Sequence, residues 1–197
     1  MLVTVWSDYL CPWCYLGLDR EQQLDDLGIE VVIRPYELHP DIPTGGRELR
    51  AGGRTAAVFD HVGRECEEVG LPFVRPRRSP NTRKVLEAAE HVRLTQPPVF
   101  PGLHRALFAA HFAEGRDIED PDVVDELIVA CGGDPAPVRA AVDDGSAHAA
   151  LRASMVEAVD HEVTGTPAFL MPSGFVIPGV QDRDTMHRVA TRLLERS

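Results

Sequence analysis

Apolar residues form two short runs near the start of the chain, at 2–6 and at 29–36, and the second run is rich in β-branched residues. Runs of this length and composition predict strands. The segment between them, 12–27, predicts a helix that ends at Gly28, because glycine commonly follows the last helical turn. A strand, a helix and a second strand in this order are typical of an α/β domain with parallel strands.

The end of the chain returns to a strand pattern. Apolar segments at 168–171 and 175–177 flank Pro172-Ser173-Gly174, and this arrangement predicts a β-hairpin. Residues 183–195 then carry apolar side chains at helical spacing. The chain is therefore expected to end with two strands and a helix.

The middle of the chain has a different character. It opens with a loop rich in proline and glycine, and apolar residues then recur at helical spacing. Helices are expected near 58–69, 82–94, 102–114, 120–131, 135–143 and 146–161. Because no strand pattern occurs here, we expect an all-helical insertion after the second strand of the α/β domain.

Composition narrows the function classes. The chain has 197 residues and a formal net charge of −11, with 20 lysine and arginine residues of which only Lys84 is a lysine. Such acidity argues against nucleic acid as a partner, because phosphate binding needs a basic face. No apolar run is long enough for a membrane span, and no leader pattern precedes the first strand. We therefore expect a cytoplasmic protein, where disulfides are usually transient and catalytic.

Cys11-Pro12-Trp13-Cys14 follows the first predicted strand directly and opens the first predicted helix. Two thiols at this spacing share one helical turn and can form a disulfide with little backbone movement. The first thiol meets unpaired backbone N–H groups and the positive end of the helix dipole, and both favour thiolate. The pKa of Cys11 should therefore fall below the free value of about 8.5, which makes Cys11 the nucleophile and Cys14 the resolving thiol.

A zinc site is the main alternative for a CxxC pair. Such a site needs about four ligands, usually from a second pair of cysteines or histidines. The other cysteines, Cys66 and Cys131, are far apart in the sequence, and His61 with Cys66 makes only one weak pair. We therefore expect no metal, and we expect Cys66 and Cys131 to be buried core thiols.

The order of elements, with CxxC after the first strand, resembles the thioredoxin fold, β-α-β … α-β-β-α. Redox proteins of this fold place a cis-proline beside the CxxC motif, at the start of the strand that leads into the final hairpin. Thr166-Pro167 stands at that point of this chain. The resemblance implies a cis bond before Pro167 and a role for the Thr166 backbone in pairing with an incoming substrate.

The whole chain resembles the DsbA-like family, in particular its cytosolic FrnE-type branch. The matching segments are residues 5–8, 11–17, 34–41, 80–82, 111–118 and 165–169. The resemblance implies a discontinuous thioredoxin-like domain, 1–37 and 162–197. It also implies a helical insertion, 38–161, that caps the active site and whose last helix returns to the core. The implied activity is disulfide exchange with protein or small-molecule thiols, with no cofactor beyond the redox-active disulfide and with glutathione as a candidate co-substrate.

One departure from the family affects the expected redox potential. Periplasmic relatives carry Pro-His between the cysteines, whereas this chain carries Pro12-Trp13. Loss of a histidine that stabilises the thiolate predicts a couple less oxidising than about −120 mV, nearer about −200 to −270 mV.

A glutathione-dependent isomerase or transferase of the kappa and hydroxychromene carboxylate isomerase type is the first alternative function, although that branch has serine at the first cysteine position. A non-redox binding or chaperone-like protein is the second.

Four further residues have two interpretations each. Trp13 is expected to be an exposed platform for substrate, with packing over Cys11 as the alternative. Asp8 is either a proton acceptor for Cys14 or a cap for the following turn. His39 either lines the cleft or is an ordinary loop residue, and Asn81 either touches substrate or caps the helix that begins at Thr82.

Five positive charges lie within ten residues of this acidic chain: Arg75, Arg77, Arg78, Arg83 and Lys84. Such a cluster could receive a carboxylate of glutathione or of another acidic substrate. The simpler interpretation is a solvated loop.

The apolar residues of the predicted helices form no heptad repeat, so a monomer and a homodimer are both consistent with the sequence.

Overall fold

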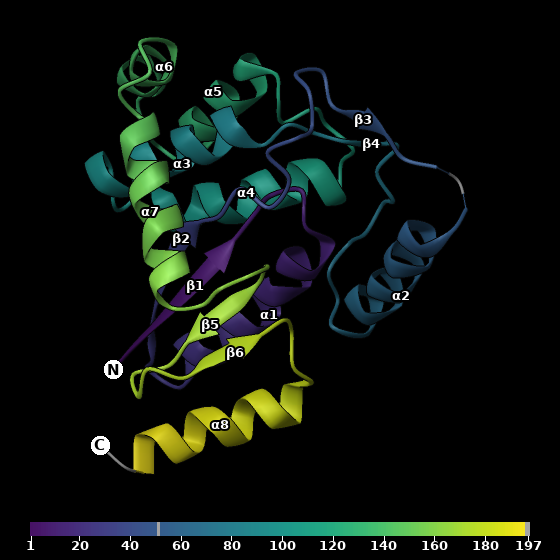
Figure 1. Cartoon of the computed structure of the whole chain (residues 1–197), viewed down its shortest axis with the longest axis vertical. Coiled ribbons are helices and arrows are strands. Elements are labelled where there is room, and N and C mark those ends of the chain that lie inside the picture. The colour runs from purple at the N-terminus through teal and green to yellow at the C-terminus, as the bar shows by residue number, and fades with distance from the viewer. Residues whose placement is uncertain (51, 196–197) are drawn as a thin grey trace.

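The computed structural model describes residues 1–50 and 52–195. Its main sheet contains β1 (Leu2–Ser7), β2 (Glu30–Pro35), β5 (Ala168–Leu170) and β6 (Val176–Pro178), in the spatial order β2-β1-β5-β6 (Figure 1). The β1 strand pairs in parallel with β2 and antiparallel with β5, and β5 pairs antiparallel with β6. The predicted thioredoxin-like α/β fold is confirmed.

Helices cover both faces of this sheet because alternate residues of β1 point to opposite sides. Val3 and Val5 pack in one cluster with residues of α1 (Pro12–Asp26) and α8 (Arg183–Glu195). Trp6 packs on the other side, in a cluster that includes Ala158 of α7. Figure 1 shows α8 on one side of the sheet and α7 on the other.

Six helices lie between β2 and β5 in the described sequence. They are α2 (Arg54–Glu68), α3 (Arg83–Thr95), α4 (Phe100–Phe112), α5 (Pro121–Ala130), α6 (Pro135–Asp143) and α7 (His148–Asp160). The side chains of Asp120 and Asp134 accept hydrogen bonds from backbone N–H groups at the starts of α5 and α6, and a proline occupies the first turn of each. An aspartate followed by a proline is a recognisable helix start, which is why these two helices could be predicted from the sequence. None of the helices within 1–50 and 52–195 combines the length and apolar content needed to cross a membrane.

The insertion is not entirely helical, and that part of the sequence-based expectation is wrong. A small antiparallel sheet joins β3 (Arg47–Glu48) to β4 (Arg78–Ser79). Strands of two residues are too short to show an alternating pattern, so pairing between distant loops defines them. The turn before β3 requires glycine, because Gly46 has a φ of +71° and a Cβ there would lie 2.7 Å from the Ser79 carbonyl oxygen.

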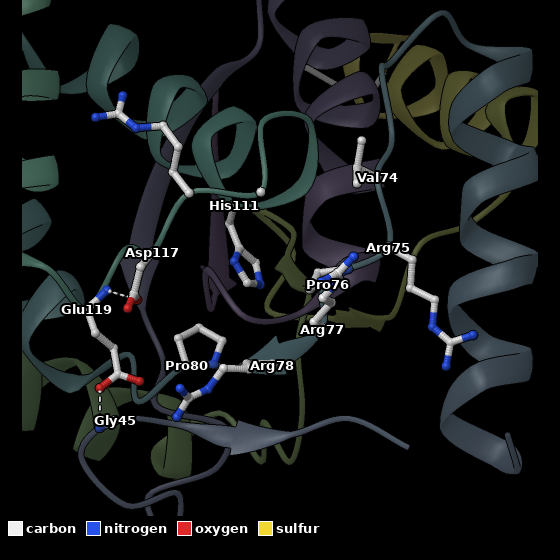
Figure 2. A pocket seen from close by; sticks show the side chains of 12 residues that line it. Gly45, Val74, Arg75, Pro76, Arg77, Arg78, Pro80, His111, Asp117 and Glu119 are labelled. Carbon is white, nitrogen blue, oxygen red and sulfur yellow. Dashed lines mark hydrogen bonds between the residues drawn. The ribbon is translucent and has the colours of Figure 1, made fainter. Parts of the chain in front are cut away.

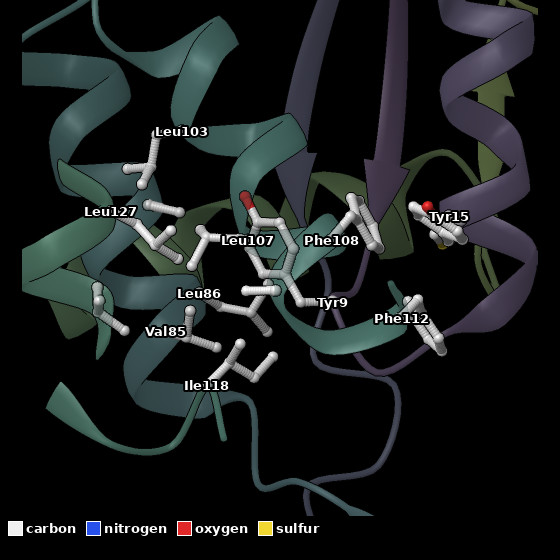
Figure 3. Close-up of a cluster of buried hydrophobic side chains, with 14 of the residues drawn as sticks. Tyr9, Tyr15, Val85, Leu86, Leu103, Leu107, Phe108, Phe112, Ile118 and Leu127 are labelled. Carbon is white, nitrogen blue, oxygen red and sulfur yellow. The ribbon is translucent and has the colours of Figure 1, made fainter. Parts of the chain in front are cut away.

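One large hydrophobic core joins α1 to the insertion (Figure 3). Tyr15 of α1 stacks on Phe112 of α4, with ring centroids 5.2 Å apart. Tyr9, in the loop before α1, lies 4.9 Å from the ring of Phe108. Cys11 and Cys14 belong to the same buried cluster. The CxxC turn is therefore supported by the insertion as well as by its own helix.

The last helix of the insertion is tied to the sheet by hydrogen bonds as well as by packing. Trp6 Nε1 donates to the Ser154 carbonyl at 3.3 Å, and the Ser154 hydroxyl donates to the Pro35 carbonyl at 2.8 Å. Arg34 of β2 lies between two carboxylates, Glu90 of α3 and Glu157 of α7, at 2.9 Å from each. These contacts fix α3 and α7 against the β2 edge of the sheet.

Candidate active site

The CxxC motif forms a tight turn at the start of α1. Cys11 is the N-cap residue and Pro12 occupies the first turn. The Cys11 carbonyl accepts the backbone N–H groups of Cys14 and Tyr15, at 3.0 and 3.2 Å. Both thiols are free and nearly covered, with 4% of Cys11 and 1% of Cys14 exposed. The turn holds the two sulfurs side by side at the helix N-terminus.

The two thiols differ in acidity. A hydrogen bond from the Cys14 thiol lowers the pKa of Cys11, and this effect outweighs the opposing effect of burial. Burial raises the pKa of Cys14 well above its ordinary value, and the Cys11 sulfur adds to that increase. The direction at Cys11 agrees with the sequence-based expectation. The structure therefore makes Cys11 the thiol that ionises first.

The segment before β5 completes the site. The Thr166–Pro167 peptide bond is cis, as predicted. Cys11 Sγ lies 3.5 Å from the Thr166 carbonyl oxygen. Pro167 packs on α1, with its Cγ 3.7 Å from the position that a Cβ on Gly17 would occupy. Within the described residues, the buried Thr166 hydroxyl has no hydrogen-bond partner. These contacts place Thr166 against the Cys11 sulfur.

Asp8 lies completely buried at the end of β1. Its carboxylate accepts the Leu38 N–H at 2.8 Å and the Leu10 N–H at 3.3 Å. Burial raises the pKa of Asp8 to about 6, against the effect of these hydrogen bonds. The bond to Leu10 agrees with the interpretation of Asp8 as a cap for the turn. A carboxyl group that titrates near neutral pH is also suited to accept a proton.

Trp13 is half-buried, which is less exposure than the platform expected from the sequence, and its contact with substrate stays a prediction. Its ring lies 5.4 Å from the ring of His61 on α2, between centroids. The central residues of a CxxC turn point away from their own helix, but here α2 of the insertion lies beside α1. No local pattern in the sequence could have indicated that His61 contacts the motif.

Two of the other candidate residues occupy positions that fit their simpler interpretations. The Asn81 side chain donates to the Ile42 carbonyl at 2.6 Å and accepts the Arg83 N–H at 3.1 Å, so it joins a loop to the start of α3. Helix α3 begins at Arg83, one residue after the expected start. His39 is exposed in the loop that follows β2. Contact of Asn81 or His39 with substrate stays a prediction.

The basic cluster separates into two surroundings. Arg83 pairs with Glu37, at 3.0 Å, and Lys84 is exposed on α3. The other three arginines line a separate pocket (Figure 2) together with Arg116 and His111, which come from a later part of the chain. Burial lowers the pKa of His111 to about 4, so this histidine is neutral near pH 7. No pattern in the sequence indicated that Arg116 and His111 belong to this pocket, because only the fold brings them to this loop.

The remaining cysteines lie outside the CxxC turn. Cys66 is completely buried, as expected, and burial raises its pKa to about 12. Cys131 is only half-buried at the end of α5, so the expectation of a fully buried thiol is wrong there. In the part of the chain that the structure describes, no group of three or more histidine, cysteine or acidic side chains is arranged to hold a metal ion.

Residues 2–190 match the family model of the DSBA-like thioredoxin domain. The chain is similar to a probable DsbA oxidoreductase from Streptomyces coelicolor, with 27% identity, a TM-score of 0.86, and coverage of 100% of this chain and 91% of that chain. A 2-hydroxychromene-2-carboxylate isomerase has the same fold, with 21% identity, a TM-score of 0.77, and coverage of 100% and 97%. So does the cytosolic disulfide reductase DsbM from Pseudomonas aeruginosa, solved with GSH, with 17% identity, a TM-score of 0.70, and coverage of 99% and 100%.

Proposed function

Since the chain belongs to the DSBA-like thioredoxin domain family, we propose that it is a thiol–disulfide oxidoreductase that uses Cys11 as nucleophile and Cys14 as resolving thiol. The observation that carries the proposal is the opposite shift of the two thiol pKa values at one helix N-terminus. A thiolate attacks disulfides, whereas a protonated thiol does not. The pair is therefore poised for attack by Cys11 and later resolution by Cys14.

The proposed exchange proceeds in two steps. The Cys11 thiolate attacks one sulfur of a substrate disulfide, which forms a mixed disulfide and releases the other substrate sulfur as a thiolate. Cys14 then loses its proton and attacks the Cys11 sulfur, which forms the Cys11–Cys14 disulfide and releases the second substrate thiolate. Two electrons pass from the protein to the substrate. The reverse sequence oxidises a substrate dithiol, and a small thiol such as glutathione would regenerate the reduced pair.

Four residues around Cys11 would position the substrate. The Thr166 carbonyl lies 3.5 Å from Cys11 Sγ, which suits backbone pairing with a chain that carries the reacting sulfur. Pro12 and Trp13 are half-buried beside Cys11 and offer apolar contact. Pro167 holds this segment against α1. We propose protein or small-molecule thiols as partners and a cytoplasmic location. The location is supported by the fold shared with DsbM, which is described as a cytosolic disulfide reductase.

Asp8 is proposed as the group that accepts the Cys14 proton. We expect Asp8→Asn to slow resolution of the mixed disulfide by roughly tenfold or more, because general base catalysis of this kind contributes about 10²–10⁴-fold.

The same change should increase the free energy of unfolding at pH 7. Burial raises the pKa of Asp8 from 3.8 to about 6, so the native state binds this proton more tightly than the unfolded state does. The protein therefore loses up to about 3 kcal/mol as pH rises from about 4 to 6.

Stopped-flow release of substrate thiol measures the resolution rate, and guanidinium unfolding between pH 4 and 7 measures the stability. The increase in the free energy of unfolding of Asp8→Asn should be smaller than about 3 kcal/mol. The two carboxylate oxygens of Asp8 accept the Leu10 and Leu38 N–H groups, whereas the NH₂ group of asparagine cannot accept a hydrogen bond. Ser7→Ala is the matched control, because Ser7 is a buried neighbour without a titrating group. An unchanged pH dependence of stability in Asp8→Asn would contradict this role of burial.

A redox titration tests the proposed function. The purified protein is equilibrated in glutathione buffers, Trp13 fluorescence reports the state of the pair, and mass spectrometry counts alkylated thiols. We expect one two-electron transition near about −200 to −270 mV, because no cationic residue lies between the cysteines to stabilise the thiolate further.

Cys14→Ala is the control for this titration and should lack the transition. If Cys11 and Cys14 stay reduced from about −120 to −280 mV, the oxidoreductase proposal fails. Turnover that requires glutathione and persists in Cys14→Ala would instead favour an isomerase or transferase. Client binding that survives Cys11→Ser, without any turnover, would favour a binding protein.

A further inference from the structure

A pocket of about 250 Å³ lies between the β3–β4 sheet and the loop that follows α4 (Figure 2). Two chain segments that are distant in sequence form it, one around residues 74–80 and one around 111–119. Arg78 lies in β4 and Arg77 directly precedes it. Both side chains are exposed, and both line this pocket. Four arginines and two carboxylates, Asp117 and Glu119, line the pocket, so it has a net positive lining on a chain whose net charge is −11.

Most charged groups of this pocket already have partners. Arg116 pairs with Glu126 and lies 3.9 Å from Glu114. Arg75 lies 3.8 Å from Asp60. The carboxylate of Glu119 accepts backbone N–H groups from two neighbouring loops.

The guanidinium groups of Arg77 and Arg78 differ from the rest. Among the residues that the structure describes, neither lies within ion-pair distance of a carboxylate. Arg78 Nη2 lies 3.8 Å from the position that a Cβ on Gly45 would occupy. His111 is neutral and buried at the same pocket, so it can hydrogen-bond without adding charge. The pocket thus contains two cations available to an anion from outside.

The pocket is connected to the CxxC turn by two short routes. The Tyr15 hydroxyl, one residue beyond Cys14, donates to the Pro72 carbonyl at 2.6 Å, and Pro72 lies only five residues before Arg77. On the other side, Trp13 contacts His61, and the adjacent Asp60 approaches Arg75. Five extended residues span at most about 18 Å. This is an upper bound for the stretch from Pro72 to Arg77 alone, so the subsite suits an acidic residue some way along a peptide from the reacting cysteine rather than the cysteine itself.

We propose that Arg77 and Arg78 form a subsite for a carboxylate on a polypeptide substrate, so that the protein prefers disulfides flanked by acidic residues. The inference rests on the proposed function and names its substrate class. Guanidinium groups bind carboxylates through paired, charge-assisted hydrogen bonds. Because the chain carries a net charge of −11, two neighbouring arginines without carboxylate partners favour one place for an acidic flank.

Matched peptide disulfides test the subsite. Two series of blocked peptides place either glutamate or glutamine one to eight residues from a single cysteine, and each peptide is used as its symmetric disulfide. We expect wild-type protein to show a higher kcat/KM for the glutamate series, with a preference that declines as salt is added. The double variant Arg77→Gln/Arg78→Gln should lose about five- to tenfold on glutamate peptides and less than about twofold on glutamine peptides.

The control is Arg152→Gln/Arg192→Gln, which removes the same charge from exposed positions on α7 and α8. Equal losses on both peptide series, or the same loss in the control variant, would overturn the subsite. So would a wild-type protein that reduces both series equally well. Absence of activity on every peptide disulfide, or full activity in Cys11→Ser, would instead overturn the proposed function, so the two failures are distinguishable.

Discussion

Cys11→Ser should abolish disulfide exchange, with a loss of at least about a thousandfold, because removal of a nucleophile leaves only binding and positioning. Cys14→Ser should have a different defect. Its Cys11 is still able to attack, but the mixed disulfide with substrate is no longer resolved from within the protein. Rapid mixing with a peptide disulfide, followed by acid quenching and mass spectrometry, measures both outcomes. Cys14→Ser should accumulate the protein–peptide adduct, and Cys11→Ser should not.

Cys131→Ser is the matched control for these variants, since Cys131 is a half-buried thiol outside the CxxC turn. It should exchange disulfides at the wild-type rate. An adduct on Cys14 in the Cys11→Ser variant would reverse the assigned roles. The pKa of Cys11 is lowered and that of Cys14 is raised, so we expect alkylation at pH 6 to modify Cys11 first.

Phe108→Ala should lower the free energy of unfolding by about 3 to 5 kcal/mol, the loss usual for a fully buried phenylalanine. Phe108 is 0% exposed in the core shared by α1 and α4. Its ring lies 4.9 Å from Tyr9, 6.1 Å from Tyr15 and 5.2 Å from His104, between centroids. Truncation leaves a cavity at the centre of these rings. Guanidinium unfolding with an unchanged m-value measures the loss.

Phe175→Ala is the comparison, because Phe175 is 66% exposed in the loop between β5 and β6. Its removal should change the free energy of unfolding by no more than about 0.5 kcal/mol. A loss below about 1 kcal/mol for Phe108→Ala would mean that the ring cluster collapses around the gap, and that α1 does not depend on α4.

The elements that could be predicted from the sequence are those with a local signal. The CxxC motif and Thr166-Pro167 are each short, and each lies beside a strand whose apolar pattern is clear. The hairpin between β5 and β6 was visible for the same reason: Gly174, with a φ of +82°, marks its turn. The order of these elements was sufficient for the fold because parallel pairing of β1 with β2 follows from the β-α-β order.

What could not be predicted depends on contacts between distant parts of the chain. The β3–β4 pair contains only two residues on each strand, so Arg47 and Ser79 carry no pattern of their own. Trp13 is half-buried because α2 lies beside α1. The basic loop becomes a pocket only when the segment carrying Arg116 packs against it. Local propensity says nothing about such contacts, which the tertiary structure alone creates.

The discontinuous sheet has a consequence for synthesis on the ribosome. Val5 of β1 faces Phe169 of β5, yet the entire insertion is translated between them. At about 5–20 residues per second, β1 waits roughly 10 to 30 s for this neighbour. During that interval one edge of β1 has no partner, and an open apolar edge invites pairing with other chains. Nascent chains of this protein should therefore need a holding chaperone until the last 30 or so residues emerge.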